Sequence, residues 1–264
     1  MKKILTIVMA SFALMSSAQN ANTGSATNEP ASIMWIEDKP GPSFQQHKTF
    51  PTVPDSLWNA LAQKEGVPSS MSCFLLKAEG KTILLDAGLG APFSQLMPKL
   101  AEAGVKPEDL TLIYITHMHG DHIGGLLKDG KVVFPNAELY INRVEVEAWK
   151  AMPDNRSAQA KSVLNAYKDH LHLFEAGDVL TGGVKTIAAY GHTPGHTVFQ
   201  KDKILVIGDL MHGAAVQLKH PEYNASFDMD QKAAIEARTR IVKYVRENGL
   251  TMYGMHLPSP GSVK

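Results

Sequence analysis

The alternation of apolar and polar positions predicts strands and helices in turn along most of the chain. Short apolar, β-branched runs bounded by turn residues predict strands at 72–76, 81–86, 110–116, 137–142, 185–190 and 203–208. Helical spacing predicts one helix that carries Phe93, Leu96, Met97 and Leu100 on one face, and further helices at 143–152, 157–170 and 230–248. Such alternation, without an internal repeat or a mid-chain linker, predicts a layered α/β fold in a single domain.

Two of these helices have recognisable ends. Gly104 and Pro107 should stop the helix that begins near Phe93. For the helix at 230–248, Asp228 or Asp230 is the expected N-cap, and Gly249 is the expected C-terminal stop.

The first eighteen residues have the three-part pattern of a secretory signal peptide. Lys2 and Lys3 precede an apolar run at 4–15, and the small residues 16–18 follow where a signal peptidase reads. The run is short for a membrane span, so an uncleaved N-terminal anchor is the less favoured alternative. We expect a signal peptide at 1–18, a polar, disordered lead-in at 19–32 and a folded domain at 33–264, in a periplasmic or secreted protein.

Composition narrows the classes of function. Lys plus Arg and Asp plus Glu both number 26, so the formal net charge is zero. This balance argues against a general nucleic-acid binder, which needs a basic surface to displace the counterions of phosphates. Cys73 is the only cysteine, which excludes an internal disulfide framework and a cysteine-rich zinc module. The 11 histidines are then the most informative feature, because histidine is a common metal ligand.

Metal-competent side chains are concentrated directly after one of the buried strands. Residues 116–122 contain His117, His119, Asp121 and His122. His117 and His119 are two positions apart, so they project to the same side of an extended chain. So many polar groups at a buried strand end are costly unless something satisfies them, and a bound cation does so. A histidine-rich surface turn is the alternative.

Three further candidates follow later elements. The run Gly-His-Thr-Pro-Gly-His-Thr at 191–197 forms a tight turn that could present His196 to a metal. For His192 we favour a hydrogen-bonded structural role over a ligand role. Asp209 ends the strand at 203–208 and His256 follows the last helix, but neither is informative alone.

Together these residues resemble the metal signature of the metallo-β-lactamase superfamily. The signature is His-x-His-x-Asp-His, then a distant His, an Asp and a final His. In this chain it is carried by His117, His119, Asp121, His122, His196, Asp209 and His256. The resemblance runs from about residue 70 to the end and implies a four-layer αβ/βα sandwich with a two-metal site at one edge.

The resemblance also implies which residues hold each of two divalent ions. The first ion would take His117, His119 and His196, the second Asp121, His122 and His256, and Asp209 would bridge both. Asp86 matches a position that orients a ligand histidine through its second ring nitrogen. Zinc is the expected metal, although iron, manganese and cobalt also accept imidazole and carboxylate ligands.

Within the superfamily the chain is most similar to the methyl parathion hydrolase and lactonase branch. The matching stretches are 115–126, 134–137, 208–209 and 214–217. Phe93 and Trp149 fall where those enzymes place aromatic pocket residues, although ordinary core packing explains them equally well. His212 stands where homoserine lactonases carry a tyrosine, and it could donate a hydrogen bond from the same place. Those relatives continue past the final histidine into another hairpin, so a truncated C-terminal hairpin is one interpretation of the end at Lys264.

The implied activity is that of a secreted di-metal hydrolase. A hydroxide bridging the metals would attack a neutral, partly apolar ester or lactone, or a phosphotriester, with Asp121 as both ligand and proton shuttle. A neutral substrate is expected because no basic cluster accompanies the metal loops. The bridging Asp209 argues against a dedicated β-lactamase. A β-lactam or thioester hydrolase and a non-catalytic metal-binding protein are the alternatives. We expect no nucleic-acid partner and no membrane partner after signal cleavage, and a homodimer stays open.

Overall fold

The computed structural model describes residues 29–264. The signal peptide predicted at 1–18 and the first part of the predicted lead-in, 19–28, lie outside the described residues. The first strand begins at Ser32, so the last residue of the predicted lead-in already pairs within a sheet, opposite Lys77.

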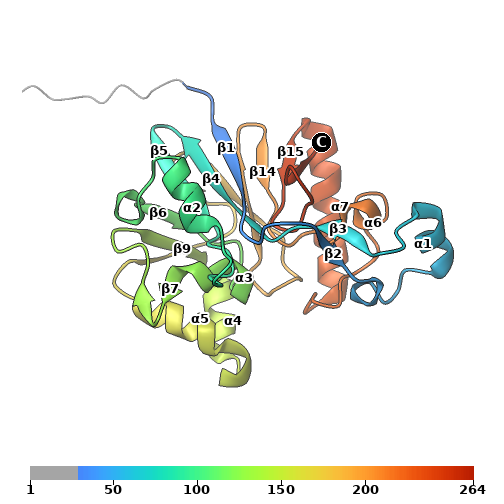
Figure 1. The fold of residues 1–264 in the computed structure, drawn as a ribbon, viewed down its shortest axis with the longest axis horizontal. Helices are drawn as coiled ribbons and strands as arrows, with labels where there is room; N and C mark the ends of the chain where they lie inside the picture. The colour runs from blue at the N-terminus through green and yellow to red at the C-terminus, as the bar shows by residue number, and fades with distance from the viewer. Residues whose placement is uncertain (1–28) are drawn as a thin grey trace, which may run out of the picture.

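The fold is built on two six-stranded sheets that face each other (Figure 1). The strands of the first sheet, in spatial order, are β1 (Ser32–Glu37), β4 (Ser72–Ala78), β5 (Lys81–Leu85), β6 (Leu112–Tyr114), β9 (Glu138–Asn142) and β10 (Leu171–Phe174). Those of the second are β11 (Val179–Leu180), β12 (Val184–Ala188), β13 (Thr197–Lys201), β14 (Ile204–Val206), β15 (Thr251–Tyr253) and β16 (Ser262–Val263). In the first sheet β5, β6, β9 and β10 run parallel, and in the second only β14 and β15 do.

Helices cover the outer face of each sheet. The first sheet carries α2 (Leu96–Glu102), α4 (Arg143–Ala151) and α5 (Asp154–Ala166), whereas α7 (Gln231–Asn248) lies on the second (Figure 1). The shorter helices are α1 (Asp55–Leu61), α3 (Gly120–Ile123), α6 (Ala214–Gln217), η1 (His47–Thr49), η2 (Pro107–Asp109) and η3 (Gly124–Leu126). Two small hairpin sheets pair β2 (Ser43–Gln45) with β3 (Val67–Ser69) and β7 (Leu127–Lys128) with β8 (Lys131–Val132). No helix within 29–264 is both long enough and apolar enough to span a bilayer.

Alternation along the strands sorts the core into layers. On β4, Phe74 and Leu76 point between the two sheets and meet Phe199 of β13, whereas Leu75 points outward beneath the helices of the first sheet. On the opposite side, Ile241 of α7 packs on the outer face of the second sheet. The order helix, sheet, sheet, helix confirms the predicted four-layer αβ/βα sandwich.

The ends of two helices decide details that the sequence left open. Asp230 is the N-cap of α7, because its side chain accepts a hydrogen bond of 3.0 Å from the Ala233 amide, and Gly249 ends the helix in the left-handed conformation. Asp228 is therefore available for another role. The helix predicted to begin near Phe93 starts only at Leu96, which leaves Phe93 in the preceding loop with 43% of its surface exposed.

Candidate metal centre

The first metal-competent loop joins β6 to α3 and is anchored by a buried carboxylate. Asp86 accepts hydrogen bonds of 2.7 Å from both the amide and the hydroxyl of Thr116, directly before His117. The same carboxylate accepts a 2.6 Å hydrogen bond from Nδ1 of His122. Asp86 thus fixes the start of the loop and leaves Nε2 of His122 directed at the centre.

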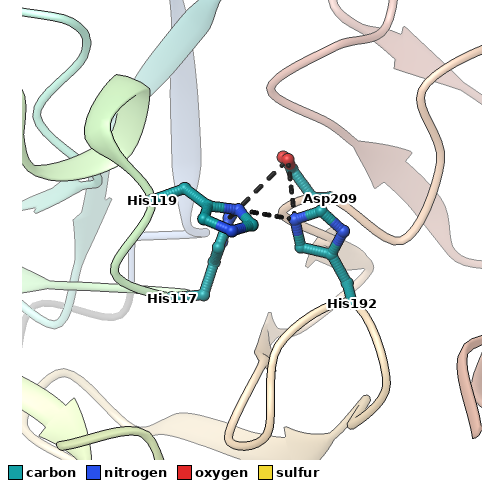
Figure 2. A group of neighbouring side chains, drawn as sticks. All are labelled: His117, His119, His192 and Asp209. Carbon is teal, nitrogen blue, oxygen red and sulfur yellow. Dashed lines mark hydrogen bonds and ion pairs between the residues drawn. The ribbon is translucent and has the colours of Figure 1, made fainter. Parts of the chain in front are cut away.

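One group of side chains combines this loop with two from the second sheet. His117, His119, His192 and Asp209 each offer one ligand atom within 4.8 Å of the others (Figure 2). Nδ1 of His119 lies 3.0 Å from Nε2 of His117 and 2.9 Å from Nε2 of His192. Asp209 Oδ2 lies 3.2 Å from Nε2 of His192 and 3.6 Å from that of His117. Three imidazoles and a carboxylate converging in this way are a ligand set suited to zinc.

His192, rather than His196, completes this group, so the sequence-based choice between them was wrong. His196 is fully buried, and both of its ring nitrogens are already engaged. Its Nδ1 donates to the Ala189 carbonyl at 3.0 Å, and its Nε2 accepts from the Asp209 amide at 3.0 Å. A neutral imidazole with one donor and one acceptor used in this way has no lone pair left for a metal.

The second group lies on the other side of Asp209. Asp121, His122 and His256 again offer ligand atoms within 4.8 Å of one another. Nε2 of His256 lies 3.3 Å from Asp121 Oδ2 and 3.1 Å from Asp209 Oδ2, while its Nδ1 contacts the Ser70 carbonyl at 2.8 Å. Nε2 of His122 lies 3.1 Å from Asp209 Oδ1. Asp209 therefore faces both groups and is placed to bridge them.

The electrostatics of the centre match a site built for cations. Burial and neighbouring imidazoles hold the pKa of His117 well below its ordinary value and lower that of His119 to about 3. Burial opposes charge on His122 and His256 too, but nearby carboxylates outweigh it, raising the pKa of His122 well above its usual value and that of His256 to about 10. Burial raises the pKa of Asp209, but the neighbouring imidazoles of His122, His256 and His117 outweigh it and hold that pKa well below the usual range.

Three buried polar atoms at the centre lack a hydrogen-bond partner. One is Nδ1 of His212, and the other two, Nε2 of His122 and Oδ1 of Asp209, face each other at 3.1 Å. Orphaned polar atoms in the interior cost free energy, and a cation held between the two that face each other would satisfy both. The residues present therefore fit a metal ion.

A further carboxylate, which sequence reasoning had considered only as a helix cap, supports His192. Asp228 Oδ1 accepts from Nδ1 of His192 at 3.0 Å, and its Oδ2 accepts from Arg238 of α7 at 3.0 Å. Arg238 is itself buried and also donates to the Leu210 carbonyl at 2.7 Å. Backbone bonds from Asp230 to Gly191 and from Met229 to His192 hold the same turn against the start of α7. No spacing in the sequence links these residues.

A cavity of about 680 Å³ opens over both groups. It is lined by Gln45, Met71, Leu89, His119, Gly120, Asp121, Arg156, His192, Asp209, His212, Ser226, Phe227, Met229 and His256. His212 lies 3.2 Å from Asp209 through Nε2, and burial lowers its pKa to about 4, so the ring is neutral at pH 7. Arg156 is the one Lys or Arg side chain in this lining, and sequence reasoning did not single it out.

The two aromatic residues suggested for the pocket do not line it. Phe93 is in an exposed loop, and Trp149 is on the buried face of α4, where its indole N–H donates to Glu145 at 2.6 Å. Trp149 reaches the centre only indirectly, with its ring edge-on to His119 at 5.6 Å between centroids. The aromatic side chain at the cavity is Phe227, which is 49% exposed and lies in an irregular segment without a sequence pattern.

Comparison with families and solved structures agrees with this geometry. Residues 66–256 match the model of the metallo-beta-lactamase superfamily. The hydrolase AbOPH of the beta lactamase superfamily has 29% sequence identity and a TM-score of 0.77, over 88% of this chain and 89% of that one. AidC, a dizinc quorum-quenching lactonase solved with the product N-hexanoyl-L-homoserine, has 25% identity and a TM-score of 0.79, over 89% and 91% of the two chains.

Curated relatives match over a shorter stretch. An N-acyl homoserine lactonase of Bacillus cereus is 30% identical over 147 residues, which are 47% of this chain and 55% of the relative. An exodeoxyribonuclease, WalJ of Streptococcus pneumoniae, is 34% identical over 123 residues, or 47% of this chain and 41% of the relative. The chain thus spans about half the length of the curated relatives it matches.

Proposed function

This chain belongs to the metallo-beta-lactamase superfamily, and we propose that it is a two-metal hydrolase of neutral, partly apolar lactones and esters. The observation that carries the proposal is the pair of His/Asp groups that share Asp209 and open into one cavity. The sandwich places the carboxyl ends of β6, β12 and β14 at one edge, so ligands far apart in sequence converge there. The dizinc lactonase AidC shows that a neighbour of this fold carries two zinc ions.

Two divalent ions, zinc by preference, would be held in the following way. The first would take His117, His119, His192 and Asp209, and the second Asp121, His122, His256 and Asp209. Such ions supply a strong oxygen nucleophile from water at neutral pH and polarise a carbonyl or phosphoryl oxygen.

Two residues at the cavity wall are assigned to handling protons and orienting the substrate. The Asp121 side chain is 22% exposed whereas that of Asp209 is nearly fully buried, so Asp121 can exchange a proton with the cavity. Its pKa is held below the ordinary range because His122 and His256 outweigh the effect of burial, so the side chain is ionised at neutral pH. His212 is neutral and its single N–H, on Nε2, faces Asp209; with Asp209 engaged by metal ions, that N–H would be available to a substrate oxygen.

The lining of the cavity supports the substrate class. Met71, Leu89, Phe227 and Met229 provide an apolar wall beside the metal groups, and 680 Å³ is within the usual size of a small-molecule site. An acyl chain would pack on that wall while the scissile carbonyl meets the metals. The homoserine product bound to AidC has this combination of an acyl chain and a polar head.

Other substrates are disfavoured by charge. A nucleic acid or a glutathione thioester carries several negative charges, and the cavity lining offers only Arg156 to pair with them. The similarity to WalJ makes phosphodiester cleavage the competing activity that an assay should include.

We also propose that the protein is exported to the periplasm or the medium, and that it dimerises. Mature protein that begins near Gln19 would support export, and an intact Met1 on cytoplasmic protein would contradict it.

The decisive experiment is a side-by-side substrate panel on metal-loaded protein. Acyl lactones and aryl esters should have the highest kcat/KM, phosphotriesters a lower one, and β-lactams and phosphodiesters little or none. Chelation should abolish every one of these activities, and an Asp209→Asn variant serves as the inactive control. If β-lactams or phosphodiesters outrank all lactones and esters, the substrate assignment is wrong. Two bound metals without turnover of any substrate would instead favour a non-catalytic metal-binding protein.

A further inference from the structure

The carboxylate of Glu145, in the first turn of α4, is completely buried beneath the two metal-bearing loops. Its Oε1 accepts from the Met118 amide at 2.9 Å and from the Trp149 indole at 2.6 Å. Its Oε2 accepts from the Thr193 hydroxyl and from the Gly195 amide, each at 2.8 Å. Four donors surround one carboxylate and offset part of the cost of burying its charge, although burial still raises its pKa.

Each oxygen of Glu145 serves a different loop. Met118 lies between His117 and His119 in the chain, so Oε1 holds the loop from the first sheet. Thr193 directly follows His192, so Oε2 holds the turn from the second sheet. The glycine at 195 permits this approach, because a Cβ there would collide with the Glu145 backbone. The carboxylate therefore spans the distance between the two loops.

The helix that carries Glu145 is itself fixed to both sheets. Asn142, at the end of β9, caps α4 by accepting from the Val144 amide at 2.9 Å. The same side chain donates to the Thr197 hydroxyl at 3.1 Å, where β13 begins. Glu145 thus projects from a rigid base rather than from a free loop.

We propose that Glu145 is the positioning residue of the first metal group, setting the separation between the His117–His119 loop and the His192 turn and so the affinity for that ion. This inference rests on the proposed function only in requiring that the centre binds metal. The second group should be insensitive, because His122 is oriented by Asp86 and His256 by Ser70, without help from Glu145.

Glu145→Gln is the informative substitution because it keeps the volume but removes one acceptor. The new amide N–H₂ would face donors on one of the two loops, and that loop would be released. Losing a residue that supports metal ligands in this way weakens affinity by about 10- to 100-fold. We expect that loss for the first ion alone.

The experiment measures zinc affinity by competition with a chromophoric chelator, together with the melting temperature of the metal-free protein. In a His256→Ala background the remaining ion belongs to the first group, and Glu145→Gln should weaken it. In a His192→Ala background the remaining ion belongs to the second group, and Glu145→Gln should leave its affinity unchanged. This crossed design assigns the effect to one ion without using turnover.

Asp38→Asn is the matched control. Asp38 is also fully buried and accepts from the Leu89 amide, the Ser94 hydroxyl and the Leu96 amide at 2.8–3.1 Å, but it holds a loop without metal-competent residues. It should lower the melting temperature of the metal-free protein and leave both zinc affinities unchanged.

Three results would overturn the inference: equal weakening of both ions by Glu145→Gln, no weakening of either, or a loss of melting temperature alone, as expected for Asp38→Asn. If Glu145→Gln does not fold, Thr193→Val removes one donor from the same carboxylate and should weaken the first ion by a smaller factor. Wild-type protein that binds no zinc would refute the inference and the proposed metal centre together. Zinc binding without hydrolysis would refute only the proposed function.

Discussion

Replacing His192 with alanine should empty the first metal group, whereas replacing His196 should reduce stability and leave the metal in place. His192 supplies one of three imidazoles around the first ion, so its loss should leave one zinc per chain where we expect the wild type to bind two. His196 makes two buried hydrogen bonds, to the Ala189 carbonyl and from the Asp209 amide. An unsatisfied buried group costs about 1–3 kcal/mol, so two of them give a loss of about 2–6 kcal/mol.

Zinc stoichiometry at saturation and thermal unfolding of the chelator-treated protein separate the two roles. For a domain of this size each kcal/mol lowers the melting temperature by about 2–4 °C, so His196→Ala should melt at least ~4 °C below the wild type. His196→Asn, which retains one donor and one acceptor, is the milder form of the same test. If His196→Ala binds one zinc while His192→Ala still binds two, the assignment of the ligand is reversed and the reasoning from ring partners fails.

Three further predictions concern pH, charge at the cavity and the cap of α7. The pKa of His122 is raised well above its usual value and that of His256 to about 10, so zinc must displace a proton from each, and affinity at the second group should rise about 10- to 100-fold per pH unit between roughly pH 7 and 9. Because the folded pKa of His256 lies above the unfolded value, the stability from its ion pairs is complete below about pH 6.5 and lost as the pH rises through 10. Chelator-treated protein should therefore melt lower at pH 10 than at pH 6, and the opposite order would contradict the pairing. Arg156→Gln should raise KM about two- to fivefold for esters that carry a remote carboxylate and leave neutral esters unchanged. Arg143→Gln, which removes an exposed arginine outside the cavity, is the control, and equal changes for both ester types would argue against a role in charge recognition. Asp230→Ala should cost about 1 kcal/mol through loss of the N-cap, read from chemical denaturation, without changing zinc stoichiometry.

The sequence predicted the parts of the fold whose signal is local. The buried strand β6 is a continuous apolar run, and α7 has both a cap and a stop that can be read directly. By contrast, β11 and β16 are only two residues long. β1 was missed as a strand because its pairing with β4, from Ser32 opposite Lys77 to Glu37 opposite Ser72, is set by contacts far apart in sequence.

The residues of the candidate site also divide into those with a local sequence signal and those placed by tertiary packing. In the run at 116–122 the close spacing of histidine and aspartate side chains indicates a metal site, so four of the metal-competent residues could be named without a structure. The choice between His192 and His196 depends on which ring nitrogens find partners, and those partners, Ala189 and Asp228 among them, are fixed only by tertiary packing. Phe227 belongs to an irregular segment without periodicity, so it could not be named in advance.

The first metal group combines His117 and His119, which follow a strand of the first sheet, with His192 and Asp209, which follow strands of the second, so a bound ion would cross-link the two halves of the molecule (Figure 2). This cross-link can form only after both halves have folded and packed together, so metal binding should be a late event in folding. An ion that binds only the closed arrangement adds stability that grows with its concentration, by about 2.7 kcal/mol at 100 times its Kd. Zinc supply would then govern how long the protein survives proteolysis, quite apart from what it hydrolyses.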